Sequence, residues 1–468
     1  MTITFLGLQV SYSQIELSAF NATGGGYATT YLSDYQTLGV NPANLGWKRK
    51  DQTINFGLLE FCGSVYSESL KRNEIINDLF DSSLEFTLED KQKAAELFIS
   101  ARLIGMISLT HLGASYQDEK IGGFGFNIRE RIYWHSIFNE NAASFLFLGY
   151  RDPYFDQKEL NDEGDTIAAI ATNMDFASGI YEGSDINFIH IREFNFGYGR
   201  ELFMLDDGIV FYGGINLKYI QAYAGMQYYQ FARGEAVGFS ALSPAYDIDY
   251  DTYTPSAMDV NGLKKSGTGF GMDLGTTILF YEKTKIGLAF NDLGSINWEG
   301  NVYEGVDVRL FKMKTGGLDN YNIFEEGEVI SVDEDPAGDD EWRGLPNKRL
   351  RLPASFRAGA SHRFSEFIEV GTDLLFPVGD KVPGSFETPV FGLGVHYNPV
   401  RRVDLSIGVV TGGKFGTNVP FGISFFPVFN ENASWEIGFA VRDISVLLIN
   451  KNPTVSSCFG FLRFGFGK

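Results

Sequence analysis

The sequence predicts an all-β protein, a transmembrane antiparallel β-barrel of about 14 strands. Two observations lead to this fold class. From Thr53 to the end of the chain, apolar and polar side chains alternate with the period of two that is typical of strands. The 468 residues also include 54 glycines and 42 phenylalanines, which suits strands joined by tight turns and carrying a broad aromatic surface.

Alternation alone does not separate a membrane barrel from a soluble β-sandwich or adhesin. In one segment, apolar Val403, Leu405 and Ile407 alternate with Asp404 and Ser406. We favour the barrel because such segments run for about 9 to 14 residues, enough to cross a bilayer when tilted. Their second face is rich in glycine and polar residues, as a narrow polar lumen requires, and aromatic residues gather near strand ends. A sandwich or adhesin would need polar outward faces.

Fifteen segments fit the strand pattern. A single-chain bacterial barrel has an even number of strands, so either one segment is spurious or a strand is missed, and 303–314 has the weakest pattern. Turns such as 206–208 would lie on the periplasmic side. The segments are approximately 53–66, 102–117, 121–135, 186–203, 208–231, 265–282, 284–297, 303–314, 351–364, 366–377, 388–398, 401–412, 416–428, 433–449 and 456–467.

Helical periodicity appears in an insertion after the first strand, at 68–100, and predicts two short helices there. Thr87 is the expected N-cap of the second helix, with Asp90 three residues further on. A further helix is expected near 138–148. The long connections are expected on the outer side of the membrane, at about 150–185, 232–264 and 315–350.

The formal net charge of −21, from 59 acidic and 38 basic residues, argues against nucleic acid as a partner. Ten acidic residues and no basic one lie in 319–342, which we interpret as a solvated loop or, alternatively, as a divalent-cation site. No histidine or cysteine spacing fits a metal site, and no nucleophile elbow or phosphate-binding loop occurs. We therefore predict no enzyme, no cofactor and no metal, with a spatial Ser-His-Asp triad as the alternative.

The two cysteines are expected near the seam of the barrel. Cys62 falls in the first predicted strand and Cys458 in the last, and these strands are neighbours in a closed barrel. Export would place both thiols in an oxidising compartment. Because barrel shear can offset the strands beyond the roughly 7 Å that a disulfide allows between Cα atoms, a bond between them is left open.

The stretch "GGGYATTYLSDYQTLGVNPANLGW" precedes the first strand. It resembles the N-terminal hatch of the long-chain fatty acid transporter (FadL) superfamily of outer-membrane barrels, and 285–298 and 352–374 are similar to paired strands of that family. Within the superfamily the chain looks similar to uncharacterised Bacteroidetes barrels, which are related to PorV of type IX secretion. The matching positions are Gly24, Gly25, Gly26, Ala28, Asp34, Asn41, Pro42 and Ala43. The expected hatch or gating residues are Gly24, Gly25, Gly26, Asp34, Asn41, Pro42, Ala43 and Asn44.

The resemblance implies a hatch over residues 15–50, inside a barrel formed by 51–468. Residues 1–14 are interpreted as the remnant of a secretory signal peptide, although the usual basic start is missing. Pro42 favours an extended Asn41, and Asn41 and Asn44 can bond nearby backbone in the absence of regular structure. We expect Pro42 to end the hatch and Trp47 to mark the periplasmic rim.

The resemblance also implies a location in the outer membrane and the passage of hydrophobic or small solutes, gated by the hatch. The expected partners are membrane lipid and a hydrophobic small-molecule ligand. The alternative is a non-transporting, PorV-like barrel that acts as a protein partner or shuttle in type IX secretion or surface assembly. The apolar ligand groove of fatty acid transporters has no residue-level signature that maps onto this sequence, so the resemblance predicts no particular substrate.

Overall fold

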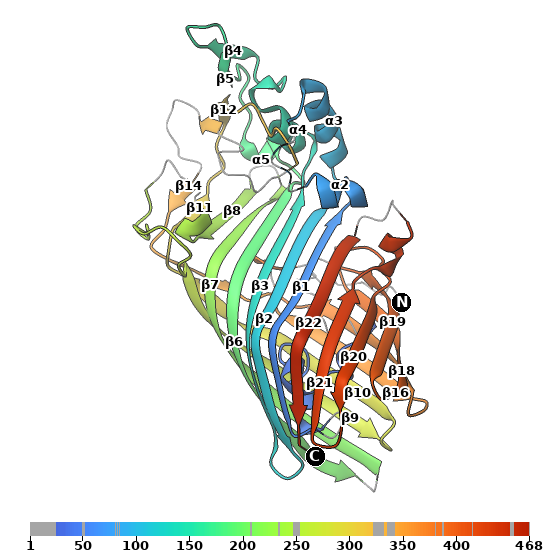
Figure 1. Cartoon of the computed structure of the whole chain (residues 1–468). Helices are drawn as coiled ribbons and strands as arrows, with labels where there is room; N and C mark the ends of the chain where they lie inside the picture. The colour runs from blue at the N-terminus through green and yellow to red at the C-terminus, as the bar shows by residue number, and fades with distance from the viewer. Residues whose placement is uncertain are drawn as a thin grey trace, which may run out of the picture.

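The computed structural model describes residues 25–48, 52–79, 81, 83, 85–205, 208–232, 235–246, 253–321, 332–334, 342–379, 381–385, 388–413, 415–449 and 454–467. Fourteen antiparallel strands close into a barrel (Figure 1). In ring order they are β1 (Ile54–Ser67), β2 (Leu103–Asp118), β3 (Gly122–Ile137), β6 (Asp185–Leu205), β7 (Ile209–Ala232), β9 (Gly267–Phe280), β10 (Thr284–Trp298), β16 (Ser355–Arg363), β17 (Ile368–Pro377), β18 (Val390–Val400), β19 (Val403–Gly412), β20 (Phe421–Phe429), β21 (Ala433–Val441) and β22 (Thr454–Phe466).

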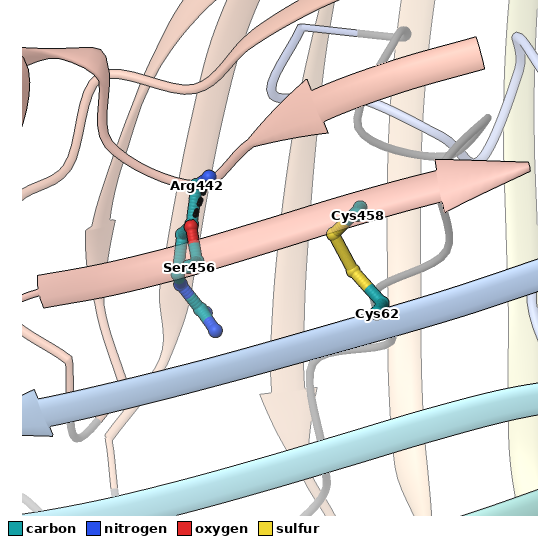
Figure 2. The surroundings of a disulfide bond; sticks show 4 residues. All are labelled: Cys62, Arg442, Ser456 and Cys458. Atoms are coloured by element: carbon teal, nitrogen blue, oxygen red, sulfur yellow. Dashed lines mark hydrogen bonds between the residues drawn. A yellow bond between two sulfur atoms is a disulfide. The ribbon is translucent and has the colours of Figure 1, made fainter. Parts of the chain in front are cut away.

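The ring closes where the first and last strands pair. Cys62 on β1 lies opposite Cys458 on β22, and a disulfide joins them across a sequence separation of 396 (Figure 2). Beside the disulfide, the backbone amide of Arg442 donates to the Ser456 hydroxyl at 2.6 Å and ties the loop after β21 to β22. The predicted pairing of the end strands is confirmed, and the bond that the sequence left open is present.

Fourteen of the fifteen predicted segments correspond to barrel strands. The prediction for 303–314 is wrong, because this segment holds two short strands outside the ring, β11 (Val302–Gly305) and β12 (Leu310–Met313). A membrane-spanning strand needs about 9 to 11 residues, so neither can cross a bilayer. β11 instead pairs with β8 (Glu235–Leu242) and β14 (Trp342–Gly344) beyond one end of the barrel.

Most of the chain outside the strands gathers at one end of the barrel (Figure 1). The predicted helices are confirmed as α2 (Arg72–Asn77), α3 (Leu88–Phe98) and α4 (Glu140–Leu148), and Thr87 and Asp90 form the capping box of α3. The connections predicted as loops contain further elements: α5 (Ala177–Ile180), β15 (Lys348–Arg351), and a sheet of β4 (Gln157–Leu160), β5 (Thr166–Ile170), β12 and β13 (Val332–Glu334).

Five short 3-10 helices complete the described elements: η1 (Asp34–Thr37), η2 (Pro42–Gly46), η3 (Gly149–Arg151), η5 (Pro244–Tyr246) and η6 (Ile444–Leu447). In the part of the chain that the structure describes, no helix is long and apolar enough to span a membrane. The predicted signal-peptide remnant at 1–14 and most of the acidic stretch at 319–342 lie outside the described residues.

The wall of the barrel has an apolar exterior. On β18 the outward side chains of Phe391, Leu393 and Val395 are between 36% and 48% exposed, whereas the inward Val390 and His396 are buried. Closure gives every strand of the ring a neighbour on each side, so most backbone bonds of the strands are made within the sheet. Internally paired backbone and an apolar outer face are the two properties that a bilayer requires of a strand-built protein.

Candidate functional site

Residues 25–48, named here the lumenal segment, run inside the barrel before β1. Gly25 lies against the backbone of Ile407 on β19, and the Leu45 carbonyl reaches Gly123 on β3. The segment therefore crosses the lumen between these parts of the wall. Its large side chains are almost fully buried, and they are Tyr27, Tyr31, Leu32, Tyr35, Leu38, Val40 and Leu45.

Inward-facing glycines of the wall form the seat of the lumenal segment. At Gly113 a Cβ atom would lie 2.1 Å from Cδ2 of Tyr35, and at Gly214 it would lie 2.3 Å from the carbonyl carbon of Pro42. Both distances are far below van der Waals contact, so a larger residue would fit only if the segment moved. The same close approach to the segment recurs at Gly57, Gly123, Gly197, Gly275, Gly359, Gly371, Gly392, Gly394 and Gly408.

Polar side chains of the wall bind the irregular backbone of the lumenal segment. Asp373 on β17 accepts from the amides of Ala28 and Thr29 at 2.8 and 3.0 Å, and from the Thr29 hydroxyl at 2.9 Å. Lys285 on β10 donates to the Thr30 carbonyl at 2.9 Å. Buried backbone without regular structure needs such partners. Three more wall side chains donate to carbonyls of the segment, and they are Gln117, Asn127 and Asn291.

The predicted acidic residue of the hatch, Asp34, has a buried cation as its partner. It begins η1 and pairs with Arg463 on β22, and Arg463 also pairs with Glu436 on β21. Burial raises the pKa of Asp34, and the Arg463 guanidinium acts in the opposite direction. The next residue, Tyr35, donates its hydroxyl proton to Glu60 on β1. η1 is therefore held to the seam of the barrel by side-chain contacts.

Asn41 connects the "NPA" motif to the wall. Its Nδ2 donates to the Thr277 hydroxyl on β9 at 2.9 Å, and its Oδ1 accepts from the Ala43 amide at 3.3 Å, which caps η2. Asn44 makes an internal bond, because its Nδ2 donates to the Leu32 carbonyl at 2.8 Å. With φ −151° and ψ 95°, Asn41 has the predicted extended conformation.

The prediction that Pro42 ends the segment is wrong. Pro42 instead begins η2, which continues to Gly46. A proline fits at the first position of a helical turn because its fixed φ suits the helix and the amide proton that it lacks has no partner there.

Two other expected residues mark the ends of the lumenal segment. Trp47 packs its ring on Tyr212 near the start of β7, with centroids 5.0 Å apart, and its carbonyl accepts from Gln117 at 2.6 Å. This is the end of the barrel that carries the short β6–β7 turn. Gly26, with φ +104°, turns the chain against β18, and Gly24 lies outside the described residues.

A layer of paired charges lies in the lumen beside the segment. It contains three cations and three anions, so its charges balance. Glu193 on β6 binds Arg129 on β3 at 2.7 Å, and Lys218 on β7 binds Asp273 on β9 at 2.9 Å. Buried charges are stable only when paired in this way. All six members are buried, and they are Arg129, Arg131, Lys218, Glu193, Asp273 and Asp292.

The next inward positions toward the end of the barrel that carries α2, α3 and α4, the predicted outer end, are apolar. Tyr133 follows Arg131 by two residues on β3, and Ile220 follows Lys218 by two on β7, so each occupies the same face of its strand as the charged residue. The sequence predicted a polar lumen, but in this half of the barrel apolar side chains gather on the inner face beside buried polar groups such as His135 and Asp185. This apolar cluster comprises Tyr66, Ile104, Met106, Tyr133, Ile189, Ile191, Ile220, Ala222, Phe239, Ala241, Ile296, Trp298, Val302, Leu352 and Phe415.

The sequence did not identify the wall residues that bind the segment. Asp373 and Lys285 each lie two residues from a glycine, in "VGTDLL" and "TKIGLAF", and nothing local distinguishes them from other polar lumen residues. An isolated polar residue beside an inward-facing glycine is the signal that could have found them. The hatch motif found the segment itself but not its partners.

The closed ring, its apolar exterior and the filled lumen define a transmembrane β-barrel of the outer-membrane class. Residues 48–430 match the model of a protein family described as "Family of unknown function (DUF5723)", and the chain belongs to this family. No curated protein matches the sequence.

Among solved structures, the chain is similar to a TodX deltaS2S3 mutant monoaromatic hydrocarbon channel, with 12% identity, 97% of this chain and 99% of that chain covered, and a TM-score of 0.49. It is also similar to the Pseudomonas putida toluene transporter TodX, with 12% identity, 98% of this chain and 100% of that chain covered, and a TM-score of 0.44. For a Pseudomonas aeruginosa FadL homologue, the identity is 10%, the comparison covers 98% of this chain and 100% of that chain, and the TM-score is 0.45. At these values the fold assignment rests on the strand pairing of this chain.

Proposed function

We propose that the protein lets hydrophobic or small apolar solutes pass through the outer membrane, with the lumenal segment as the gate. The observation that carries this proposal is the apolar cluster in the outer half of the lumen. A water-filled channel for polar solutes would be lined by polar side chains at this level. Inward-facing Trp298, Ile191 and Ile220 instead favour a solute whose apolar surface leaves water when it binds.

The charged layer restricts the route of such a solute. An apolar molecule gains nothing among buried ion pairs, and separating those pairs is costly, so the route should avoid the wall from β3 to β10. One row of paired residues on neighbouring strands includes the disulfide. From β19 to β2, this row carries only small inward side chains. They are Ser406, Gly422, Ala440, Cys458, Cys62 and Ser108. At this height the wall side chains obstruct a solute least on the β19–β2 side, and below it the Asp34–Arg463 pair must separate for the solute to pass.

This route identifies the part of the segment that must move. η1 contacts β1, β2 and β3, beside the row of small side chains, whereas η2 packs mainly on β6, β7 and β9 and contacts β3 and β2 less. Gly39 lies between the two turns with φ +85°, a conformation that glycine adopts without strain. We infer that η1 swings about Gly39 while η2 stays in its seat.

Two engineered disulfides can test this gate. The ideal Cβ position at Gly113 lies 2.7 Å from Cγ of Tyr35, and that at Gly275 lies 3.2 Å from Cγ of Asn41. Both are close to the roughly 3 Å between a cysteine Cβ and the partner sulfur in a disulfide. Tyr35→Cys with Gly113→Cys should therefore lock η1 to β2, and Asn41→Cys with Gly275→Cys should lock η2 to β9.

The measurement is uptake of a labelled monoaromatic hydrocarbon and of a labelled long-chain fatty acid by intact cells that depend on this protein for entry. Under oxidising conditions, the η1 lock should reduce uptake to the level of cells without the protein, and mild reduction should restore it. The η2 lock is the control and should keep uptake, and the four single variants are measured to record the effect of each substitution without a lock. If neither lock changes uptake, the segment is not the gate. If cells with and without the protein take up both probes equally, solute passage is wrong.

A second candidate function is a non-transporting, PorV-like barrel that serves as a partner in type IX secretion or surface assembly. The outer part of the molecule supports it, because α2, α3 and α4 share one buried core while α5, β5 and β12 contribute to another. The barrel therefore carries a folded body beyond its outer end. Deleting the gene would then remove specific proteins from the cell surface and leave the uptake of both probes unchanged.

A further inference from the structure

At the end of β6 next to the β6–β7 turn, β3 does not extend far enough to pair with one edge of the strand. β6 pairs with β7 as far as Leu205, which lies opposite Ile209. On its other side, β6 pairs with β3 only as far as Gly199, opposite Gly123. Among the described residues, no strand pairs with the stretch from Glu201 to Leu205 on that side. The backbone there has one paired edge and one open edge.

The same stretch exposes four consecutive apolar side chains. Leu202, Phe203, Met204 and Leu205 are between 50% and 57% exposed, although successive residues of a strand point to opposite faces. Phe203 stacks on Phe211 of β7, with centroids 4.5 Å apart, so the hairpin is ordered by its own contacts. Apolar surface is therefore exposed on both faces of the stretch.

Hydrogen bonding near the open edge is provided by the chain itself. Nε of Arg200 donates to the carbonyl of Glu201 at 2.9 Å, and Glu201 is the second residue after the last pairing with β3. A side chain in this position satisfies one backbone acceptor where strand pairing has stopped. The stretch that follows, to Leu205, keeps its strand conformation without a second neighbour.

An open sheet edge is not stable in hydrocarbon, because each unpaired amide and carbonyl would have no partner there. The edge therefore belongs in the aqueous periplasm, where the exposed apolar side chains are unfavourable. A strand that pairs along the edge removes both problems at once, and this is how exposed edges recruit extended peptides.

We propose that the Glu201–Leu205 edge of β6 is a docking site for an extended, largely apolar segment of a periplasmic polypeptide. The incoming segment would continue the line of β3 beyond Gly122 and extend the existing sheet by one strand. Main-chain hydrogen bonds would supply affinity, and side chains such as Leu202 and Met204 would select apolar residues on each face. This site is separate from the lumen and does not depend on solute passage.

The test uses the purified full chain in detergent micelles and in lipid nanodiscs. The probe is a synthetic peptide of four Val-Thr repeats between two lysine pairs, and the control is the same peptide methylated on every backbone nitrogen. Amide hydrogen exchange is followed at residues 201–205. We expect fast exchange in the free protein in both environments and at least tenfold slower exchange with the probe, but no change with the methylated peptide.

Two lysine variants locate the site. Met204→Lys should abolish the protection by the probe, because a lysine on an edge strand opposes pairing. Leu160→Lys, on exposed β4 at the outer end, is the matched control and should keep the protection. Heat-modifiable gel migration verifies that both variants are folded.

Four results would overturn the proposal. Slow exchange without peptide in micelles would mean that the chain or a second copy already covers the edge, and size-exclusion chromatography separates these cases. Slow exchange only in nanodiscs would mean that lipid covers it. Equal protection by the methylated peptide would mean that apolar contact without strand pairing explains the effect. No protection by the probe would mean that the edge does not accept a strand.

Discussion

The glycine seat makes a quantitative prediction at Gly113. This residue faces the lumen from β2, opposite Gly57 of β1, and its Cβ position lies 2.1 Å from Cδ2 and 2.4 Å from Cε2 of Tyr35. In Gly113→Ala the methyl group and the ring cannot occupy these positions together. The ring must turn away, and its hydroxyl then leaves Glu60, which is buried.

The cost follows from these two events. Overpacking a tight site costs about 1 to 3 kcal/mol, and leaving a buried polar group without its hydrogen bond costs about 1 to 3 kcal/mol more. Alanine in place of glycine in a strand recovers roughly 0.5 to 1 kcal/mol of chain entropy. Gly113→Ala should therefore lower the free energy of unfolding by roughly 1 to 5 kcal/mol. Most of this cost should vanish when Tyr35→Ala removes the ring.

The measurement is urea unfolding in detergent micelles, followed by tryptophan fluorescence, on the four members of a double-mutant cycle. Gly105→Ala is the control on the same strand, because its new Cβ would meet only Cβ of Trp134 at 3.8 Å and should cost little. Amide exchange of η1 should increase in Gly113→Ala and not in Gly105→Ala. Equal costs of Gly113→Ala with and without the Tyr35 ring would refute the seat described here.

Three further predictions concern other parts of the fold. Replacing Cys62 and Cys458 together by alanine should lower the temperature at which the folded gel form is lost, since the chain-entropy estimate for so long a loop is roughly 6 kcal/mol. Hydrogen bonds from Lys348 and Arg343 lower the pKa of Glu304, so its contribution to stability is present above its unfolded pKa and is lost as pH falls through the folded value. Exchange at residues 302–305 should thus rise on acidification, and Glu304→Gln should remove this pH dependence. Thr87→Ala should destabilise α3 by about 1 kcal/mol, measured as faster exchange in its first turn.

The sequence predicts the fold well because a barrel strand is a local pattern. Alternation with a period of two marks each strand without knowledge of its neighbours, and it located all 14 barrel strands. The one wrong segment shows the limit of this reasoning. "VYEG" and "LFKM" are rich in apolar residues, but they stop after four residues and pair with β8, β14, β5 and β13 outside the ring.

The site was less predictable because its contacts are distant in sequence. Asp34 and Arg463 are 429 residues apart, and Thr29 and Asp373 are 344 apart, so no local spacing relates them. The charged layer and the apolar layer of the lumen were also hard to predict, because they too form from residues that are distant in sequence. Alternation shows that a residue such as Ile220 shares a face with Lys218, but only the register of many strands reveals that the charges gather at one height and the apolar residues at the next.

The glycine content has a second meaning that only the assembled barrel reveals. Tight turns explain some of the 54 glycines, but Gly57, Gly113 and Gly214 lie inside strands, where glycine is normally unfavourable. Each of them faces the lumen at the level of the segment and allows its backbone or a ring to approach where a Cβ atom would collide. A barrel without a lumenal segment would gain stability from larger side chains at these positions. Glycines on the inward face of the predicted strands therefore indicate a lumen filled by the chain itself, and they are a signal for such a segment that is independent of the "NPA" motif.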